Sequence, residues 1–155
     1  MKRALLSFAL LALAACATTP APDGPDAPVR ALYAIAQQHI GHSVTPLSAI
    51  PMTDDLRSLV DRAEAAARAR NEPFIEGDLA ADCQDCTSLT DLDLYRQGPR
   101  NGRAIVYARF KLNGADPRSV RYNMLLTPQG WRIDNIVSGK SDLRADAQAY
   151  LAPPP

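Results

Sequence analysis

The clearest pattern of hydrophobic and polar positions lies in the last third of the chain. Apolar residues occupy every second position there, in three runs separated by turn-forming residues. The runs cover residues 104–112, 119–127 and 131–137. A period of two places alternate side chains on opposite faces of a β-strand. Because short turns join antiparallel neighbours, the pattern predicts an antiparallel meander.

A shorter alternating run at residues 91–96 predicts one more strand before this meander. The Gly-Pro-Arg-Asn-Gly-Arg segment at residues 98–103 then predicts a turn. In the next strand, one face is expected to carry Ala104, Val106, Ala108, Phe110 and Leu112. In the strand after it, the corresponding face carries Val120, Tyr122, Met124 and Leu126. Phe110 is expected in the core, and the pattern leaves open which face of the sheet is concave.

Apolar positions three and four residues apart predict two helices in the first half of the chain. The first helix is expected at residues 29–41, after Pro28 and ending at Gly41. The second is expected at residues 54–70, with Thr53 as its N-cap. Its apolar stripe becomes alanine-rich, so its second half should pack closely against a neighbour. A last short helix is expected at residues 142–151, capped by Ser141.

The order of these elements defines the predicted fold class. It is α+β, with N-terminal helices packed on one face of a curled antiparallel β-meander and a short C-terminal helix. The folded domain is expected to span residues 29–151. Residues 152–155 are expected to form a disordered tail.

The N-terminus reads as a bacterial export signal. Lys2 and Arg3 precede an apolar stretch of about 12 residues, too short to span a bilayer as a permanent helix. The stretch ends in Leu-Ala-Ala-Cys at residues 13–16, which resembles the lipobox of bacterial lipoproteins. The resemblance implies a signal peptide at residues 1–15 and lipidation of Cys16. The alternative is ordinary secretion with cleavage at a small-residue site.

The residue after that cysteine indicates the destination. Lipoproteins with an aspartate at this position are commonly retained in the inner membrane, whereas this chain has Ala17. The resemblance therefore implies the periplasmic face of the outer membrane. Residues 16–28 are expected to be the lipidated cysteine and a proline-rich tether, which could span about 30 Å if about ten residues extend fully.

The charge composition argues against a nucleic-acid-binding protein. The chain has 17 basic and 17 acidic residues, and loss of Lys2 and Arg3 with the leader would leave 15 against 17. A net charge of about −2 gives no support for binding nucleic acid, which requires a dense basic surface.

Two cysteines, Cys83 and Cys86, remain if Cys16 is lipidated. In an oxidising periplasm we expect them to form a local disulfide. A redox motif and a zinc site are the alternatives. Asp82 and Asp85 should raise the thiol pKa, which disfavours redox catalysis. A zinc site would add His39 and His42 and would require the end of the first helix to reach this loop.

The domain resembles the nuclear-transport-factor-2-like cone fold, in particular the bacterial lipoproteins of unknown function built on it. The residues that carry this resemblance are the Asp82–Asp85 segment, the strand at residues 104–110, and Gly-Trp-Arg-Ile-Asp-Asn-Ile at residues 130–136. It covers residues 29–151. It implies a pocket between the curled sheet and the helices, which enzymes of this fold line with Asp, His or Tyr.

Polar side chains on the predicted strands are the candidates for such a pocket. The candidate residues are Tyr107, Arg109, Tyr122, Arg132 and Asp134. A solvated outer face or a cross-strand ion pair would explain each of them equally well. Trp131 is expected in the core. The sequence contains no nucleophile elbow, phosphate-binding loop or HExxH motif, and no cofactor is expected.

These observations favour a non-enzymatic lipoprotein that binds a periplasmic protein partner or a small ligand. The alternative is a hydrolase or isomerase that uses the cone pocket. A related hypothesis is a self-protection or envelope-assembly factor that binds another protein through an exposed sheet face. An apolar patch on that face would support this hypothesis.

Overall fold

The computed structural model describes residues 23–139 and 141–152. The expected signal peptide, the lipidation site Cys16, the first part of the tether and most of the C-terminal tail lie outside the described residues. The helices are α1 (Ala27–His39), the 3₁₀ turn η1 (Leu47–Ala49), α2 (Asp54–Arg70) and α3 (Leu143–Leu151). The strands are β1 (Leu89–Arg100), β2 (Arg103–Leu112), β3 (Asp116–Thr127), β4 (Gly130–Ser138) and β5 (Ser141–Asp142).

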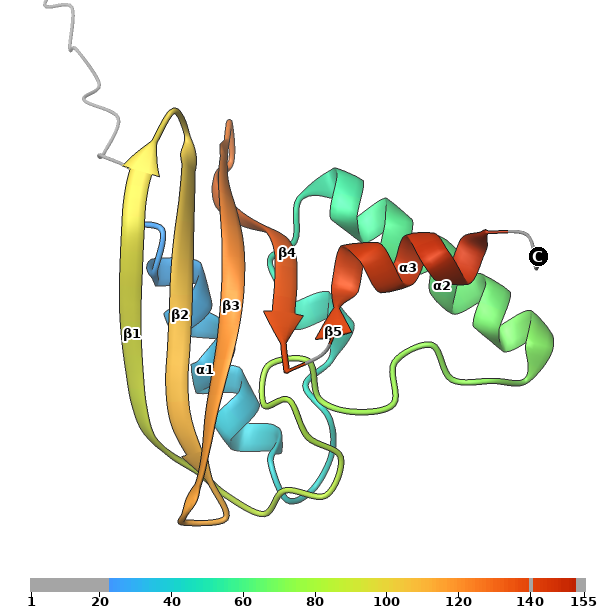
Figure 1. The fold of residues 1–155 in the computed structure, drawn as a ribbon, viewed down its shortest axis with the longest axis horizontal. Helices are drawn as coiled ribbons and strands as arrows, with labels where there is room; N and C mark the ends of the chain where they lie inside the picture. The colour runs from blue at the N-terminus through green and yellow to red at the C-terminus, as the bar shows by residue number, and fades with distance from the viewer. Residues whose placement is uncertain (1–22, 140, 153–155) are drawn as a thin grey trace, which may run out of the picture.

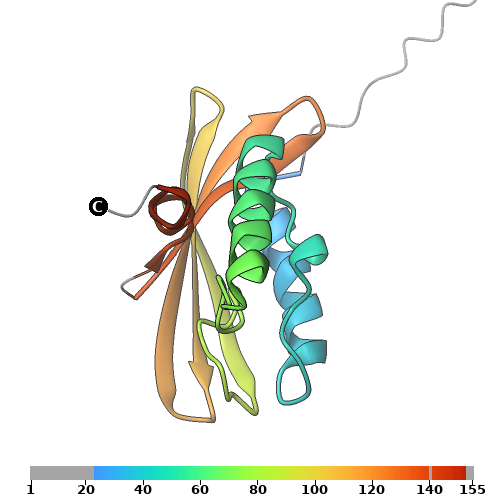
Figure 2. The same cartoon turned by 90° about the vertical axis from the view of Figure 1, so that its right-hand side faces the viewer.

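The five strands form one antiparallel sheet in chain order, β1-β2-β3-β4-β5. The first three strands stand side by side in Figure 1, with α1 behind them. Seen from the side in Figure 2, α1 and α2 both lie on the same side of these strands. The predicted α+β fold class is therefore confirmed, with the N-terminal helices α1 and α2 on one side of a curled meander (Figure 2) and a short C-terminal helix.

Most predicted elements are present, and their ends differ for local reasons. Helix α1 begins two residues earlier than predicted because Pro28 fits the first helical turn, where its missing N–H is not needed. Strand β1 extends to Arg100 because its pairing with β2 continues past a register shift between Gln97 and Arg100, and Arg100 lies opposite Arg103. The cap of α3 is Asp142 and not the predicted Ser141, since Asp142 accepts the Ala145 N–H at 3.1 Å.

The face of β2 that carries Phe110 is the inner one, and its five alternating side chains are all buried. On β3, Val120, Tyr122 and Met124 are buried on the same side, whereas Leu126, the last of that alternating set, is 41% exposed. Leu126 lies at the tip of the β3–β4 hairpin. The position next to it is Gly102, which has no side chain to cover it.

An aromatic cluster fills the space between α1 and the sheet. The ring of Tyr33 lies 5.4 Å from that of Phe110 and 6.2 Å from that of Tyr122, measured between centroids. The Tyr122 hydroxyl lies 3.1 Å from the Tyr33 hydroxyl, which donates to the carbonyl of Ala80 at 2.7 Å. Helix α1, the sheet and the loop that contains Ala80 are thus joined at one point.

A second, smaller cluster joins α3 to α2 through Leu59, Ala63 and Ala147. Small side chains allow the two helices to approach closely, as the alanine-rich stripe of α2 predicts. Arg144 of α3 strengthens this junction. Its guanidinium binds Asp134 of β4 at 2.9 Å and Asp55 of α2 at 2.6 Å.

We predict that the N-cap of α3 makes the domain sensitive to acid. Although burial raises the pKa of Asp142, hydrogen bonds from Asn135 and from the Ala145 N–H lower it by more, with help from the charge of Arg121. A pKa below the unfolded value stabilises the fold above about pH 4, and this contribution disappears as the pH falls through the folded pKa. Urea unfolding between about pH 7 and pH 3 should show a smaller loss for Asp142→Asn than for the wild type. Equal losses would contradict this assignment.

Candidate functional site

The five predicted pocket residues do not line one pocket. Tyr107 and Arg109 lie on the face of the sheet opposite the core, whereas Tyr122 is completely buried in the core. Arg132 lies beside Trp131, facing a hollow that also involves the start of α1. Asp134 joins the sheet to α3 through Arg144.

Tyr107 and Arg109 belong to an exposed surface, which we call the outer face. It includes alternate side chains from β1, β2 and β3: Asp93, Tyr95, Gln97, Ile105, Tyr107, Arg109, Ser119, Arg121, Asn123 and Leu125. Residues paired across strands share a face, so the register places Tyr95, Tyr107 and Arg121 in one row. No helix of the described part covers this face of β1–β3 in either view (Figures 1 and 2).

Two tyrosines and an arginine form the centre of the outer face. The rings of Tyr95 and Tyr107 lie 6.1 Å apart, and the Arg109 guanidinium lies 5.8 Å from the Tyr95 ring. Tyr95 is 48% exposed. The sequence analysis selected Tyr107 and Arg109 as candidates but missed Tyr95. Tyr95 lies on a different strand, and only the pairing of β1 with β2 brings it beside them.

Arg121 extends this row toward β4. Its Nε atom is buried and has no hydrogen-bond partner among the described residues. A buried donor without an acceptor costs free energy. The charge of Arg121 acts on Asp142, which strand pairing places in the same row, and Arg109 lies opposite Asp93.

One end of the outer face is hollowed. A cavity of about 470 Å³ is lined by the row Gln97, Ile105 and Asn123, together with Arg103 and Asp134. Arg103 lies 3.8 Å from Asp134, which also accepts from Thr53 at 3.3 Å. Asp134 thus binds Arg103, Thr53 and Arg144, and these contacts connect β4 to the start of α2 and to α3.

The concave side of the sheet is filled by side chains. Tyr33 and Tyr122 have no exposed surface, and Phe110 is 3% exposed. Burial raises the pKa of both tyrosine hydroxyls well above the ordinary value. These hydroxyls therefore stay neutral at physiological pH and are out of reach of a substrate.

The cysteine-bearing loop is organised by Asp78, which sequence reasoning missed. One of its carboxylate oxygens accepts the backbone N–H groups of Ala80 and Ala81, at 2.8 and 3.0 Å. The other accepts both the N–H and the hydroxyl of Thr45 at 2.7 Å. Aspartates often bind backbone groups two residues ahead in turns, so the Asp-Leu-Ala-Ala sequence contains a recognisable signal.

Cys83 and Cys86 lie in this loop with their sulfur atoms 2.04 Å apart, which is disulfide distance. The zinc alternative required the end of α1 to reach this loop. His42, which follows α1, lines a hollow of about 380 Å³ together with Cys83 and Cys86, so the two segments do lie close together. His39 instead binds Ser43 at 2.8 Å. Within the described residues, no three His, Cys, Asp or Glu side chains are grouped in a way that could hold a metal ion.

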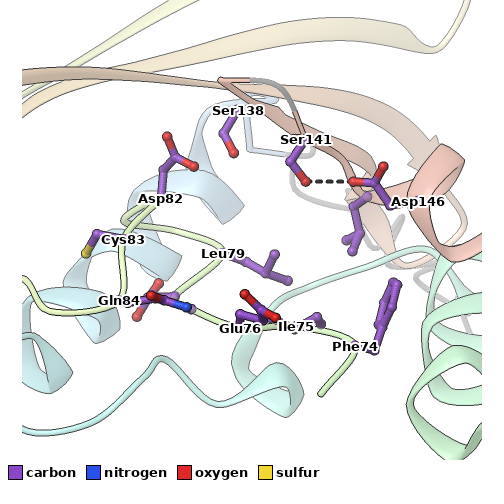
Figure 3. Close-up of a pocket in the computed structure, with 13 residues that line it drawn as sticks. Phe74, Ile75, Glu76, Leu79, Asp82, Cys83, Gln84, Ser138, Ser141 and Asp146 are labelled. Carbon is purple, nitrogen blue, oxygen red and sulfur yellow. Dashed lines mark hydrogen bonds between the residues drawn. The ribbon is translucent and has the colours of Figure 1, made fainter. Parts of the chain in front are cut away.

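A smaller cavity of about 280 Å³ separates the cysteine loop from the chain around β5 (Figure 3). Glu76 and Asp82 line it from the loop, and Asp146 lines it from α3. The Asp146 carboxylate accepts from the Ser141 hydroxyl at 2.7 Å, the contact drawn as a dashed line. Among the described residues, the ionisable side chains that line this cavity are carboxylates.

No protein-family model matches this chain, and no curated protein or solved structure shows significant similarity to it. In the part that the structure describes, no helix has the length and apolar character needed to cross a membrane.

We predict that Asp78→Ala destabilises the domain by about 3 kcal/mol, since buried donors of Thr45, Ala80 and Ala81 would lose their acceptor. The measurement is urea unfolding at neutral pH. Asp85→Ala is the matched control because Asp85 is an exposed aspartate of the same loop, and it should change stability by less than about 0.5 kcal/mol. Equal effects of the two variants would refute the role of Asp78.

Proposed function

We propose that this chain is a lipoprotein anchored to the periplasmic face of the outer membrane, and that its folded domain binds a protein partner through the outer face. The observation that carries the binding role is the exposed cluster of Tyr95, Tyr107 and Arg109. The anchor rests on the sequence around Cys16.

The chemistry of the outer face supports a protein partner. Tyrosine and arginine are enriched where protein interfaces gain most of their binding energy. The centre of the face offers aromatic rings, and Arg109 offers an exposed cationic donor beside them. We therefore expect a partner that presents apolar side chains together with a carboxylate.

The packing of the concave side argues against the enzyme alternative. A hydrolase or isomerase with a cone pocket needs reactive groups that a substrate can reach. The space where such a pocket would lie contains Tyr33, Phe110 and Tyr122, packed against one another. A small ligand could still occupy the hollow near Gln97 and Asp134, so a direct binding test should include the whole outer face.

We predict that the mature protein begins at a lipidated Cys16. Its mass should exceed that of residues 16–155 by a diacylglyceryl group and an acyl chain, measured on protein extracted from membranes. The Cys16→Ser variant should lose membrane attachment. If that variant is processed and attached like the wild type, the lipidation proposal is wrong.

We also predict that the outer face contacts a specific envelope protein. A photo-crosslinking residue in place of Tyr95 should yield a discrete adduct in cells, and Arg109→Glu in the same chain should reduce its yield about tenfold, as expected for an interface residue worth more than 1 kcal/mol. The control position is Arg62, which is exposed on α2. The same adduct from Arg62 would show that the contact does not depend on the outer face.

A further inference from the structure

Two hairpin tips and the beginning of the described chain lie together at one end of the domain. The β1–β2 tip spans residues 97–103 and the β3–β4 tip spans residues 126–132. They are in contact, because the Leu126 N–H donates to the Gly102 carbonyl at 2.8 Å. Asp26, just before α1, binds Arg96 of β1 at 2.9 Å. Figure 1 shows both tips at the top, where the chain enters the domain.

The charges of this end are predominantly basic. The two tips contain Arg100, Arg103 and Arg132 and no acidic residue. Around them, Asp26 is neutralised by Arg30 and Arg96, at 3.3 and 2.9 Å. The charged residues of the tips, their direct ion-pair partners and the hollow beside Arg132 are Arg30, Arg96, Arg100, Arg103 and Arg132 against Asp23, Asp26 and Asp134. Asp134 is also paired with Arg144, which in turn binds Asp55. This end therefore carries a net positive charge.

The opposite end is acidic. The cysteine loop, at the bottom of Figure 1, carries Glu76, Asp78, Asp82 and Asp85 without a basic residue among them. The β2–β3 turn at the same end contributes Asp116, which is paired with Arg118 at 2.7 Å. The charge is thus separated along the length of the domain, although the chain as a whole is nearly neutral.

An apolar side chain stands at the basic end. Leu126 is one of three large hydrophobic side chains that are exposed in the described part of the chain. Pro99 and Pro128 at the two tips are exposed beside it. An apolar group surrounded by arginines is the arrangement by which peripheral domains enter the headgroup region of a membrane.

We infer that this basic end docks onto the anionic phospholipid surface of the membrane to which the chain is anchored. Arg100, Arg103 and Arg132 would bind lipid phosphates, and Leu126 would enter the boundary between headgroups and acyl chains. The inference rests on the proposed lipid anchor for the orientation of the domain. Asp23 follows Cys16 by seven residues, so the chain could extend at most about 25 Å between the anchor and this end.

Docking in this orientation would arrange the rest of the molecule. The acidic end would point away from a surface that repels it. The long strands β1–β3 would stand upright on the membrane, because the tips lie at one end of them (Figure 1). The outer face would then stand perpendicular to the membrane plane, where a partner in the same membrane could reach it.

The test is co-sedimentation with vesicles, using the unlipidated chain from Ala17 to Pro155. This chain can be used because every buried core residue lies between Val29 and Ala147. We expect binding to vesicles of phosphatidylcholine with phosphatidylglycerol, little binding to phosphatidylcholine alone, and a loss of binding as salt is raised. Arg100→Glu combined with Arg103→Glu should weaken binding by about tenfold or more, and Leu126→Asp should also weaken it.

The matched control is Lys111→Glu combined with Arg118→Glu, which reverses two charges at the opposite end. Thermal unfolding should confirm that all variants are folded. Equal binding to both vesicle types, no binding at all, or an equal loss in the control would overturn the inference. The mass measurement on Cys16 tests the anchor separately, so failure of one proposal can be distinguished from failure of the other.

Discussion

The fold depends on burial of the concave face of the sheet against α1. Tyr33 lies at the centre of this contact, touching Phe110 and Tyr122 with its ring and the Ala80 carbonyl with its hydroxyl. Removing large apolar groups from water is the main force that favours folding, and the internal hydrogen bonds avoid the cost of burying hydroxyls. The same contact positions the helix, the strands and the cysteine loop.

This packing determines which surfaces remain for function. Since the concave side is occupied by the core, the accessible chemistry lies on the outer face, in the shallow hollows and at the two ends of the strands. The network of Asp134, Arg144 and Asp55 attaches α2 and α3 beside β4. That placement leaves the outer face of β1–β3 uncovered (Figures 1 and 2), with Tyr95 and Arg109 exposed to solvent and Tyr107 half-buried between them. A domain of this kind is suited to contact other molecules through its surface.

Local sequence signals predicted much of the fold. The alternation of β2, with Phe110 expected in the core, specified its buried side because a strand has only two faces. Thr53 marked the start of α2 through its capping hydroxyl, and α2 has the predicted bounds. Predictions failed where a local signal competed with a distant contact. Leu126 follows the apolar pattern but is exposed, because its neighbour on the adjacent β1–β2 tip is Gly102, which has no side chain to cover it.

The sequence by itself determined the class of fold, the two alternating faces of the strands and the expectation of a lipid anchor at Cys16, because each depends on residues close together in the chain. Only the tertiary structure decided that Tyr95 stands beside Tyr107, that Asp78 organises the cysteine loop, and that the arginines of two hairpins gather where the chain enters. Those arrangements depend on strand register and on packing between distant segments. No local pattern specifies them, since their energies arise only when the whole core has formed.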